Sequence, residues 1–189
     1  MTTDPRILRS KEAVLGETYR LLAESGIGGV SIDEVSRRSG VSKTTIYRHW
    51  PSRSALLLEA CSTMGAPMET PDTGSLRADL TALVGELAEH LRTEHWAAVL
   101  PSIVDAAERD PELADLQTRL QEAMMAPFLA VLERAKKRGE LPRGARPTDV
   151  VAGVVGPLFY RRWFSREPLD GAFVKSVVSG VVGLGAGKR

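Results

Sequence analysis

The stretch SIDEVSRRSGVSKTTIYRHWP, residues 31–51, predicts two short helices joined by a tight turn. Ser31 is suited to cap the first helix, because its hydroxyl can accept a free N–H of the first turn. Gly40 is suited to the left-handed residue that ends this helix. Ser42 can then cap a second helix from Lys43 to His49. Two helices joined by a short glycine-containing turn are typical of the helix-turn-helix of DNA-binding proteins.

Basic residues gather in and just after this stretch. Between Val35 and Leu58 the sequence has no Asp or Glu, but it has five Lys or Arg and one His. These residues are Arg37, Arg38, Lys43, Arg48, His49 and Arg53. The formal net charge of the whole chain is only +1, so bulk charge does not identify a partner. A local cluster of positive charge in a near-neutral chain is the pattern expected of a phosphate-binding surface.

Length and composition set the class of protein. The chain has 189 residues, of which 43% are hydrophobic and 26% charged, which fits one large or two small domains with a real core. Cys61 is the single cysteine, which excludes an intrachain disulfide scaffold. No apolar run is long enough to span a membrane, and the start MTTDPRILRSKE is too polar for a signal peptide. We therefore expect a cytoplasmic protein with no membrane partner.

Apolar residues recur at helical spacing along the chain, which predicts an all-α fold of about nine helices. Outside the opening stretch, the first expected helix starts at about Asp4 or Ile7 and ends at Ser25. The others cover residues 53–64, 75–92, 95–109, 110–138, 147–164 and 170–184, with a kink or break at Pro101 and a bend at Pro127. The stretch GAPMETPDTG, residues 65–74, has no helical period. It is expected to separate a helix-turn-helix domain, 1–64, from a C-terminal helical bundle, 75–189.

The second helix of the motif divides into a buried and an exposed side. Ile46 belongs to the buried side. The residues left to face DNA are Ser42, Lys43, Thr44, Thr45, Tyr47, Arg48 and His49. Lys, Arg and Thr suit base edges and phosphates, and the Tyr hydroxyl can donate to a phosphate. Ser31 and Arg53 stand at the starts of neighbouring helices, where backbone N–H groups also attract phosphate.

These residues resemble the DNA-binding domain of the TetR family of transcriptional repressors. The matching segment is SIDEVSRRSGVSKTTIYRHWPSRSALL, in which the family more often has Ala at Ser36, Phe at Trp50 and Lys at Arg53. Residues 109–113 (RDPEL), 138–141 (RGEL) and 156–158 (GPL) are similar to one branch of the family. The resemblance implies a homodimer that offers two helix-turn-helix motifs to a palindromic operator of double-stranded DNA. It also implies a C-terminal domain that binds a small effector.

The last two expected helices are rich in Val and Gly. Gly153 with Gly156, and Gly180 with Gly183, allow close helix packing, either across a homodimer through these two helices or in an ordinary core. The candidate effector contacts are large apolar side chains, which are otherwise core residues: Trp96, Leu100, Met124, Met125, Phe128, Phe159 and Trp163. Met and aromatic side chains line adaptable pockets, so the expected effector is small and apolar or amphipathic.

No pattern in the sequence indicates catalysis. A nucleophile with a spaced base, a glycine-rich phosphate loop and a paired-carboxylate pattern are all missing from it, so we expect no enzyme and no cofactor. Glu86 and His90 can share a helix face near His95, but a solvated helix end explains them better than a metal. Two hypotheses follow. One is a ligand-responsive transcriptional repressor, and the other is an all-α ligand-binding or enzymatic protein whose basic helix pair is structural.

Overall fold

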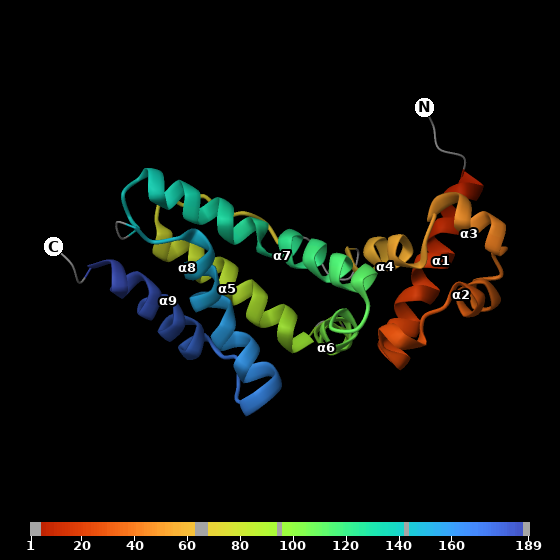
Figure 1. Cartoon of the computed structure of the whole chain (residues 1–189). Coiled ribbons are helices and arrows are strands. Elements are labelled where there is room, and N and C mark those ends of the chain that lie inside the picture. Colours follow the sequence, from red (N-terminus) through yellow and green to blue (C-terminus); the bar gives the residue numbers. More distant parts are fainter. Residues whose placement is uncertain (1–4, 63–67, 94–95, 142–143, 187–189) are drawn as a thin grey trace. The chain divides into compact units, whose positions relative to one another are not determined.

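The computed structural model describes residues 5–62, 68–93, 96–141 and 144–186. Over these ranges the chain forms nine α-helices with short 3-10 and π-helical turns and no strand, which confirms the predicted all-α fold (Figure 1). The chain divides into two compact units. Unit 1 is Met1–Ala66 with Glu94–Gln121, and unit 2 is Pro67–Thr93 with Glu122–Arg189. Unit 1 therefore takes in a segment beyond residue 64, and the functional division into 1–64 and 75–189 stays a prediction.

Unit 1 contains the helix-turn-helix. Its elements are α1 (Pro5–Ser25), the 3-10 helix η1 (Ile27–Gly29), α2 (Ile32–Ser39), α3 (Lys43–His49), α4 (Arg53–Ser62), α6 (Trp96–Ala107) and the first part of α7 (Pro111–Lys137). Helix α1 contacts α2, α4 and α6, and α2 contacts α3. The two helices of the predicted motif thus rest on a scaffold made by the other helices of the unit.

One apolar core joins these elements. Val35 of α2, Ile46 of α3 and Leu56 of α4 are completely buried in it. Val99 and Ile103 of α6 belong to the same core. Burial of such a side chain contributes about 1.5–3 kcal/mol. The positions of α2 and α3 are therefore fixed by packing, because helices this short are marginal on their own.

Local signals set the ends of α2 and α3 as predicted. The Ser31 hydroxyl accepts the Glu34 N–H at 3.1 Å, and the Ser42 hydroxyl accepts the Thr45 N–H at 3.3 Å. Gly40 ends α2 with φ 69°, and its N–H donates to the Ser36 carbonyl at 3.1 Å. Only glycine adopts this left-handed conformation without a steric cost. These contacts fix the turn between the two helices.

Unit 2 is a helical bundle. Its elements are α5 (Leu76–Thr93), the second part of α7, α8 (Pro147–Phe159), the π-helical turn η2 (Tyr160–Ser165) and α9 (Gly171–Ala186). Helices α5, α8 and α9 contact one another, as Figure 1 shows. Leu83 of α5, Phe128 of α7 and Val154 of α8 are completely buried. Among the described helices, none is both long and apolar enough to cross a membrane.

A polar cluster joins the start of α5 to the end of α7. The Glu140 carboxylate accepts the Leu76 N–H at 2.6 Å and pairs with the Arg138 guanidinium. Hydrogen bonds from Arg138 and Leu76 hold the pKa of Glu140 below its usual range. Asp79 is fully buried and accepts the N–H and the hydroxyl of Thr73 at 2.8 and 2.7 Å. This cluster anchors the segment that leads into α5.

The prolines lie inside continuous helices. Helices α6 and α7 continue through Pro101 and Pro127, so of the kink or break predicted at Pro101 the break is excluded, and the kink there and the bend at Pro127 stay predictions. A proline inside a helix costs about 3 kcal/mol, but buried neighbours such as Ile103 and Phe128 stabilise the helical path here. The helix predicted over 147–164 is α-helical up to Phe159 and continues as the π-helical turn η2 from Tyr160. Pro157, three residues before η2, has no N–H and therefore removes one helical hydrogen bond.

Replacement of Gly40 by Ala should destabilise unit 1 by about 1–2 kcal/mol, because a Cβ is strained at positive φ. The position has open space around it, so a clash cannot explain such a loss. The measurement is urea unfolding followed by circular dichroism. Gly16→Ala, at an open position inside α1, is the control and should stabilise by about 0.5–1 kcal/mol. Equal effects of the two variants would contradict the assigned conformation.

Candidate nucleic-acid interface

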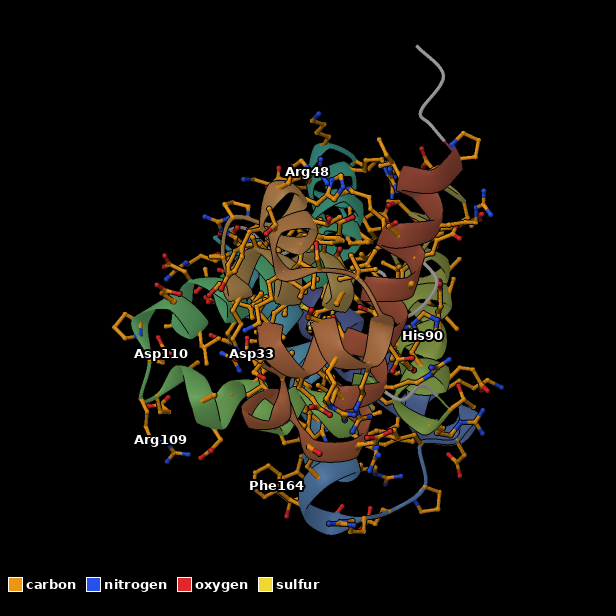
Figure 2. All side chains as sticks on the ribbon, turned by 90° about the vertical axis from the view of Figure 1, so that its right-hand side faces the viewer. Asp33, Arg48, His90, Arg109, Asp110 and Phe164 are labelled. Atoms are coloured by element: carbon orange, nitrogen blue, oxygen red, sulfur yellow. The ribbon has the colours of Figure 1, made fainter. Side chains whose placement is uncertain are left out.

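The polar side of α3 is turned to solvent. Ile46 is buried, whereas Ser42, Lys43, Thr44, Tyr47 and Arg48 are exposed and Thr45 and His49 are half-buried. Tyr47 is 50% exposed, which is high for a large aromatic side chain. Figure 2 shows Arg48 on this helix. The predicted DNA-contact residues of α3 therefore form one accessible surface, while their contact with DNA stays a prediction.

Hydroxyl groups organise the start of α3. The Ser42 and Thr45 hydroxyl oxygens lie 3.0 Å apart, and Arg48 Nη2 donates to the Thr45 hydroxyl at 3.2 Å. The Arg48 guanidinium is thereby held along the helix while staying exposed. Arg48 can donate from its remaining N–H groups to a phosphate or a base edge.

Trp50 anchors the end of α3. Its indole is 2% exposed, and its N–H donates to the Glu59 carboxylate at 2.7 Å. The Lys11 ammonium lies 3.6 Å from the same carboxylate and 5.3 Å from the centre of the indole ring. His49 meets Trp50 edge to face. The tryptophan thus gains a hydrogen-bond partner that a phenylalanine at this position would not use.

Acidic residues from outside the acid-free window pair with its arginines. The Glu34 carboxylate accepts from Arg37 Nε at 2.9 Å and from Arg38 Nε at 2.8 Å, and Arg38 Nη1 lies 2.7 Å from Glu24. The hydrogen bonds from Arg37 and then Arg38 lower the pKa of Glu34 to about 2. This stabilising effect exists at neutral pH and is lost as the pH falls from about 4.5 toward 2. Arg37 and Arg38 therefore contribute less positive electrostatic potential to the surface of the helix-turn-helix than the sequence alone suggests.

Arg53 turns toward the protein. Its Nε donates to the Val30 carbonyl at 2.7 Å, and its Nη2 donates to the Ile27 carbonyl. The guanidinium at the start of α4 therefore holds both ends of the short connection between α1 and α2. Arg53 is one of the phosphate contacts predicted from the sequence, and its contact with DNA stays a prediction. The structure adds a role inside the protein that only the folded connection could reveal.

The same connection is held from α6. The Ser102 hydroxyl accepts the Ile27 N–H at 3.1 Å and donates to the Val99 carbonyl at 2.7 Å. Gly26, the residue before Ile27, has a φ of 64°, and a Cβ added to it would lie 3.1 Å from the Ser102 side chain. Glycine is required for both its conformation and this close approach. Helix α6 is thus in direct contact with the segment that carries α2.

The proposed effector residues do not form one described pocket. Met125 and Phe128 are core residues of unit 2, and Met124 is half-buried. The rings of Phe159 and Trp163 lie 4.8 Å apart, both half-buried. Leu100 is half-buried in unit 1, whereas the side chain of Trp96, like residue His95, lies outside the described residues.

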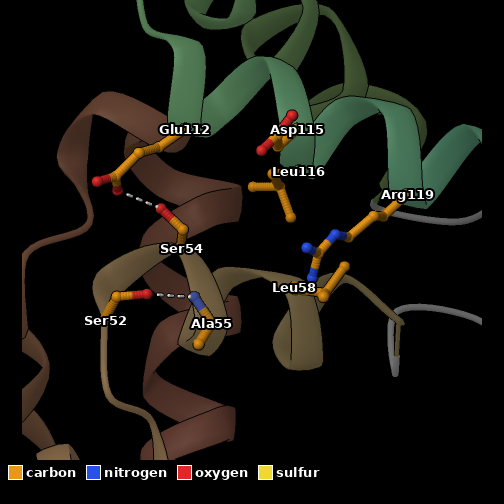
Figure 3. A pocket seen from close by; sticks show the side chains of 8 residues that line it. All are labelled: Ser52, Ser54, Ala55, Leu58, Glu112, Asp115, Leu116 and Arg119. Carbon is orange, nitrogen blue, oxygen red and sulfur yellow. Dashed lines mark hydrogen bonds between the residues drawn. The ribbon is translucent and has the colours of Figure 1, made fainter.

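The described hollow is elsewhere, in unit 1 between α4 and α7 (Figure 3). It has a volume of about 240 Å³ and is lined by Ser52, Ser54, Ala55, Leu58, Glu112, Asp115, Leu116 and Arg119. The Ser54 hydroxyl donates across it to Glu112 at 2.9 Å. No sequence signal pointed to these residues, since they come from helices far apart in the chain. Among the described residues no group of acidic, His or Cys side chains is placed to hold a metal.

Comparisons with known proteins agree with this geometry. Residues 9–60 match the family model "Bacterial regulatory proteins, tetR family", and residues 70–181 match "Tetracyclin repressor-like, C-terminal domain". The chain is 29% identical over 176 residues to the uncharacterized HTH-type transcriptional regulator YdeS of Bacillus subtilis, covering 92% of this chain and 88% of that one. It is 31% identical over 173 residues to the DNA-binding transcriptional repressor TetR of Mycobacteroides abscessus, covering 90% of each.

A solved structure gives the same result. The crystal structure of the TetR family transcription regulator SCO0332 superposes with a TM-score of 0.70 at 30% identity. The match covers 92% of this chain and 97% of that one. The similarity therefore extends through both units, beyond the helix-turn-helix alone.

Replacement of Arg53 by Met should destabilise the protein by about 2 kcal/mol, because two carbonyls lose a charged donor. DNA affinity should fall for all sequences while the slope of log affinity against log salt stays the same. The measurements are urea unfolding and fluorescence anisotropy over a salt series. Arg20→Met, an exposed arginine of α1, is the control and should change stability by less than about 0.5 kcal/mol. A salt slope reduced by about one for each protomer would instead make Arg53 a phosphate contact.

Proposed function

The chain belongs to the TetR family of bacterial transcriptional regulators, and from this premise we propose that it is a ligand-responsive repressor. It binds a palindromic operator as a homodimer, with α3 of each protomer in a major groove. The observation that carries the proposal is the exposed polar face of α3, built on a helix-turn-helix with both caps formed. Because its proposed partner is operator DNA, we also propose a cytoplasmic location.

The residues of α3 take different parts in this proposal. Lys43 and Thr44, in the first turn, face base edges, where Lys donates to guanine and the Thr methyl meets a thymine methyl. Tyr47 and Arg48 donate to phosphates, which fixes register and affinity. Ser31, Ser42, Thr45 and His49 complete the proposed set of DNA contacts, and Ser31 and Ser42 are exposed whereas Thr45 and His49 are half-buried.

The C-terminal part, residues 75–189, is proposed to dimerise through α8 and α9. A Cβ added at Gly156, Gly180 or Gly183 would meet nothing within 4 Å, so the protomer leaves open space at these positions of α8 and α9. Tyr160 and Phe164 stack next to α8 and are 60% and 75% exposed. Exposed aromatic side chains beside small residues suit a face that another protomer covers.

The effector is proposed to be small and apolar or amphipathic. Met124, Phe159 and Trp163 are half-buried in unit 2, so their apolar side chains are partly open to a ligand. The alternative, an all-α enzyme or carrier with a structural basic helix pair, is not favoured, because the relatives above are named as transcriptional regulators.

The test of function is selection of a binding site from random duplexes, followed by fluorescence anisotropy at moderate salt. Wild type should bind the selected duplex at least about a thousandfold more tightly than random duplex. Arg48→Ala should weaken both complexes alike and lower the salt slope by about one for each protomer. Lys43→Ala should change the preferred base at particular positions and cost about 1–3 kcal/mol there.

The matched control is Arg109→Ala in unit 1, an exposed arginine that pairs with Asp105 outside the helix-turn-helix (Figure 2). This variant should bind both duplexes like wild type. If wild type shows no preference over random duplex, the repressor proposal fails. If Arg48→Ala and Lys43→Ala both behave like wild type, the assigned orientation of α3 fails.

Replacement of Gly156 or Gly180 by Leu should weaken the homodimer by about tenfold or more, because overpacking a helix contact costs about 1–3 kcal/mol. Sedimentation equilibrium over a concentration series measures this directly. Gly16→Leu introduces the same bulk at an open position of α1 and should leave the dimer unchanged. A strictly monomeric wild type at micromolar concentration would contradict the dimer, and equal effects of all three variants would contradict its location.

A further inference from the structure

An ion pair crosses the helix-turn-helix. Asp33, the second residue of α2, has a side chain that is 74% exposed (Figure 2). Its Oδ1 contacts the ammonium of Lys43, the first residue of α3, whose side chain is 55% exposed. The other acid in the first turn of α2, Glu34, is paired with the arginines of its own helix. Asp33 is thus the acid that reaches the proposed recognition helix.

This contact affects how Lys43 can use its charge. An exposed ion pair contributes little to stability, so the pair is not explained as a structural support. A lysine ammonium has three N–H donors, and a carboxylate that occupies one leaves the others able to meet further acceptors. Asp33 therefore leaves N–H donors of Lys43 available, but its charge changes the free energy with which Lys43 binds different kinds of acceptor.

Neutral and anionic acceptors differ in this respect. The O6 and N7 atoms of guanine are neutral, so Lys43 can donate to them while Asp33 stays in contact. A DNA phosphate is anionic and would be brought close to the Asp33 carboxylate. Like charges repel, so Lys43 would have to leave Asp33 behind, unpaired and facing the DNA backbone. The pair thus penalises a phosphate contact more than a base-edge contact.

We propose that Asp33 is a specificity-determining residue, which lowers affinity for non-cognate DNA by keeping Lys43 from acting as a phosphate ligand. The proposal rests on the proposed DNA-binding function and goes beyond it. The selectivity of the interface then depends in part on the Asp33 carboxylate, which lies on α2 and repels a DNA phosphate. Non-specific binding depends almost entirely on phosphate contacts, so it is the property that Asp33 should change most.

The test is Asp33→Asn, which keeps the shape and removes the charge. Its affinity for a random 30-base-pair duplex should rise about threefold to tenfold, and the salt slope should steepen by about one for each protomer. Affinity for the selected duplex should rise less, so the ratio of specific to non-specific affinity should fall. Asp33→Glu keeps the charge and should stay close to wild type in both measurements. Fluorescence anisotropy over a salt series supplies all of these values.

A second comparison tests the route through Lys43. In a Lys43→Met background, Asp33→Asn should no longer steepen the salt slope. Glu12→Gln removes an exposed acid from α1 of the same unit and is the control for the loss of one negative charge. It should leave both the slope and the affinity ratio unchanged.

Three results would overturn the inference: an Asp33→Asn slope and affinity ratio equal to wild type, an equal effect of Asp33→Asn with and without Lys43, or an equal effect of Glu12→Gln. Each of them leaves the repressor proposal intact, provided that wild type prefers the selected duplex. Loss of that preference in wild type would instead remove the proposed function, which keeps the two failures apart. Circular dichroism melting of each variant verifies that the fold is retained.

Discussion

The guanidinium of Arg53 is the polar contact that, together with the buried core, fixes the connection between α1 and α2 in unit 1. It sits at the start of α4 and holds the carbonyls of Ile27 and Val30, the two ends of the connection between α1 and α2. Ser102 of α6 holds the N–H of Ile27 from another element. Because α2 and α3 are too short to be stable alone, their direction is set by this clamped connection and by the core beneath them. A change at α4 or α6 therefore acts on the connection that leads into α2 and α3.

The electrostatics of the interface follow from pairing rather than from the number of basic residues. Arg37 and Arg38 share the Glu34 carboxylate, Arg53 is turned inward, and Lys43 is paired with Asp33. Arg48, by contrast, is exposed and donates to a neutral hydroxyl. The surface of α2 and α3 therefore has a moderate positive potential, and neighbouring groups orient its N–H donors. Such a surface favours binding that depends on base contacts over binding to any DNA backbone.

The sequence predicted local features well and tertiary ones poorly. Ser31, Gly40 and Ser42 act through their own caps and turn, so their roles depend only on residues within a few positions along the chain. The all-α fold and the bounds of α3 were correct for the same reason. Arg53 acts on the connection between α1 and α2 and Asp33 acts on α3, and charge spacing along the chain does not reveal such partners.

Packing explains the remaining differences. Proline is a strong local signal for a break, yet the buried neighbours of Pro101 stabilise a continuous α6. The large apolar residues proposed for the effector include Met125 and Phe128, which are buried in the core of unit 2. Apolar character at helical spacing predicts burial, but it does not separate a core position from a pocket wall.

In the proposed complex, two copies of α3 bind two major grooves of one operator, one helical turn or a multiple of it apart. Hydroxyl-radical footprinting of wild type on the selected duplex tests it most directly. The account predicts two protected blocks related by two-fold symmetry, with centres about 34–36 Å apart or a multiple of that distance. A single protected block, or protection without symmetry, would contradict it.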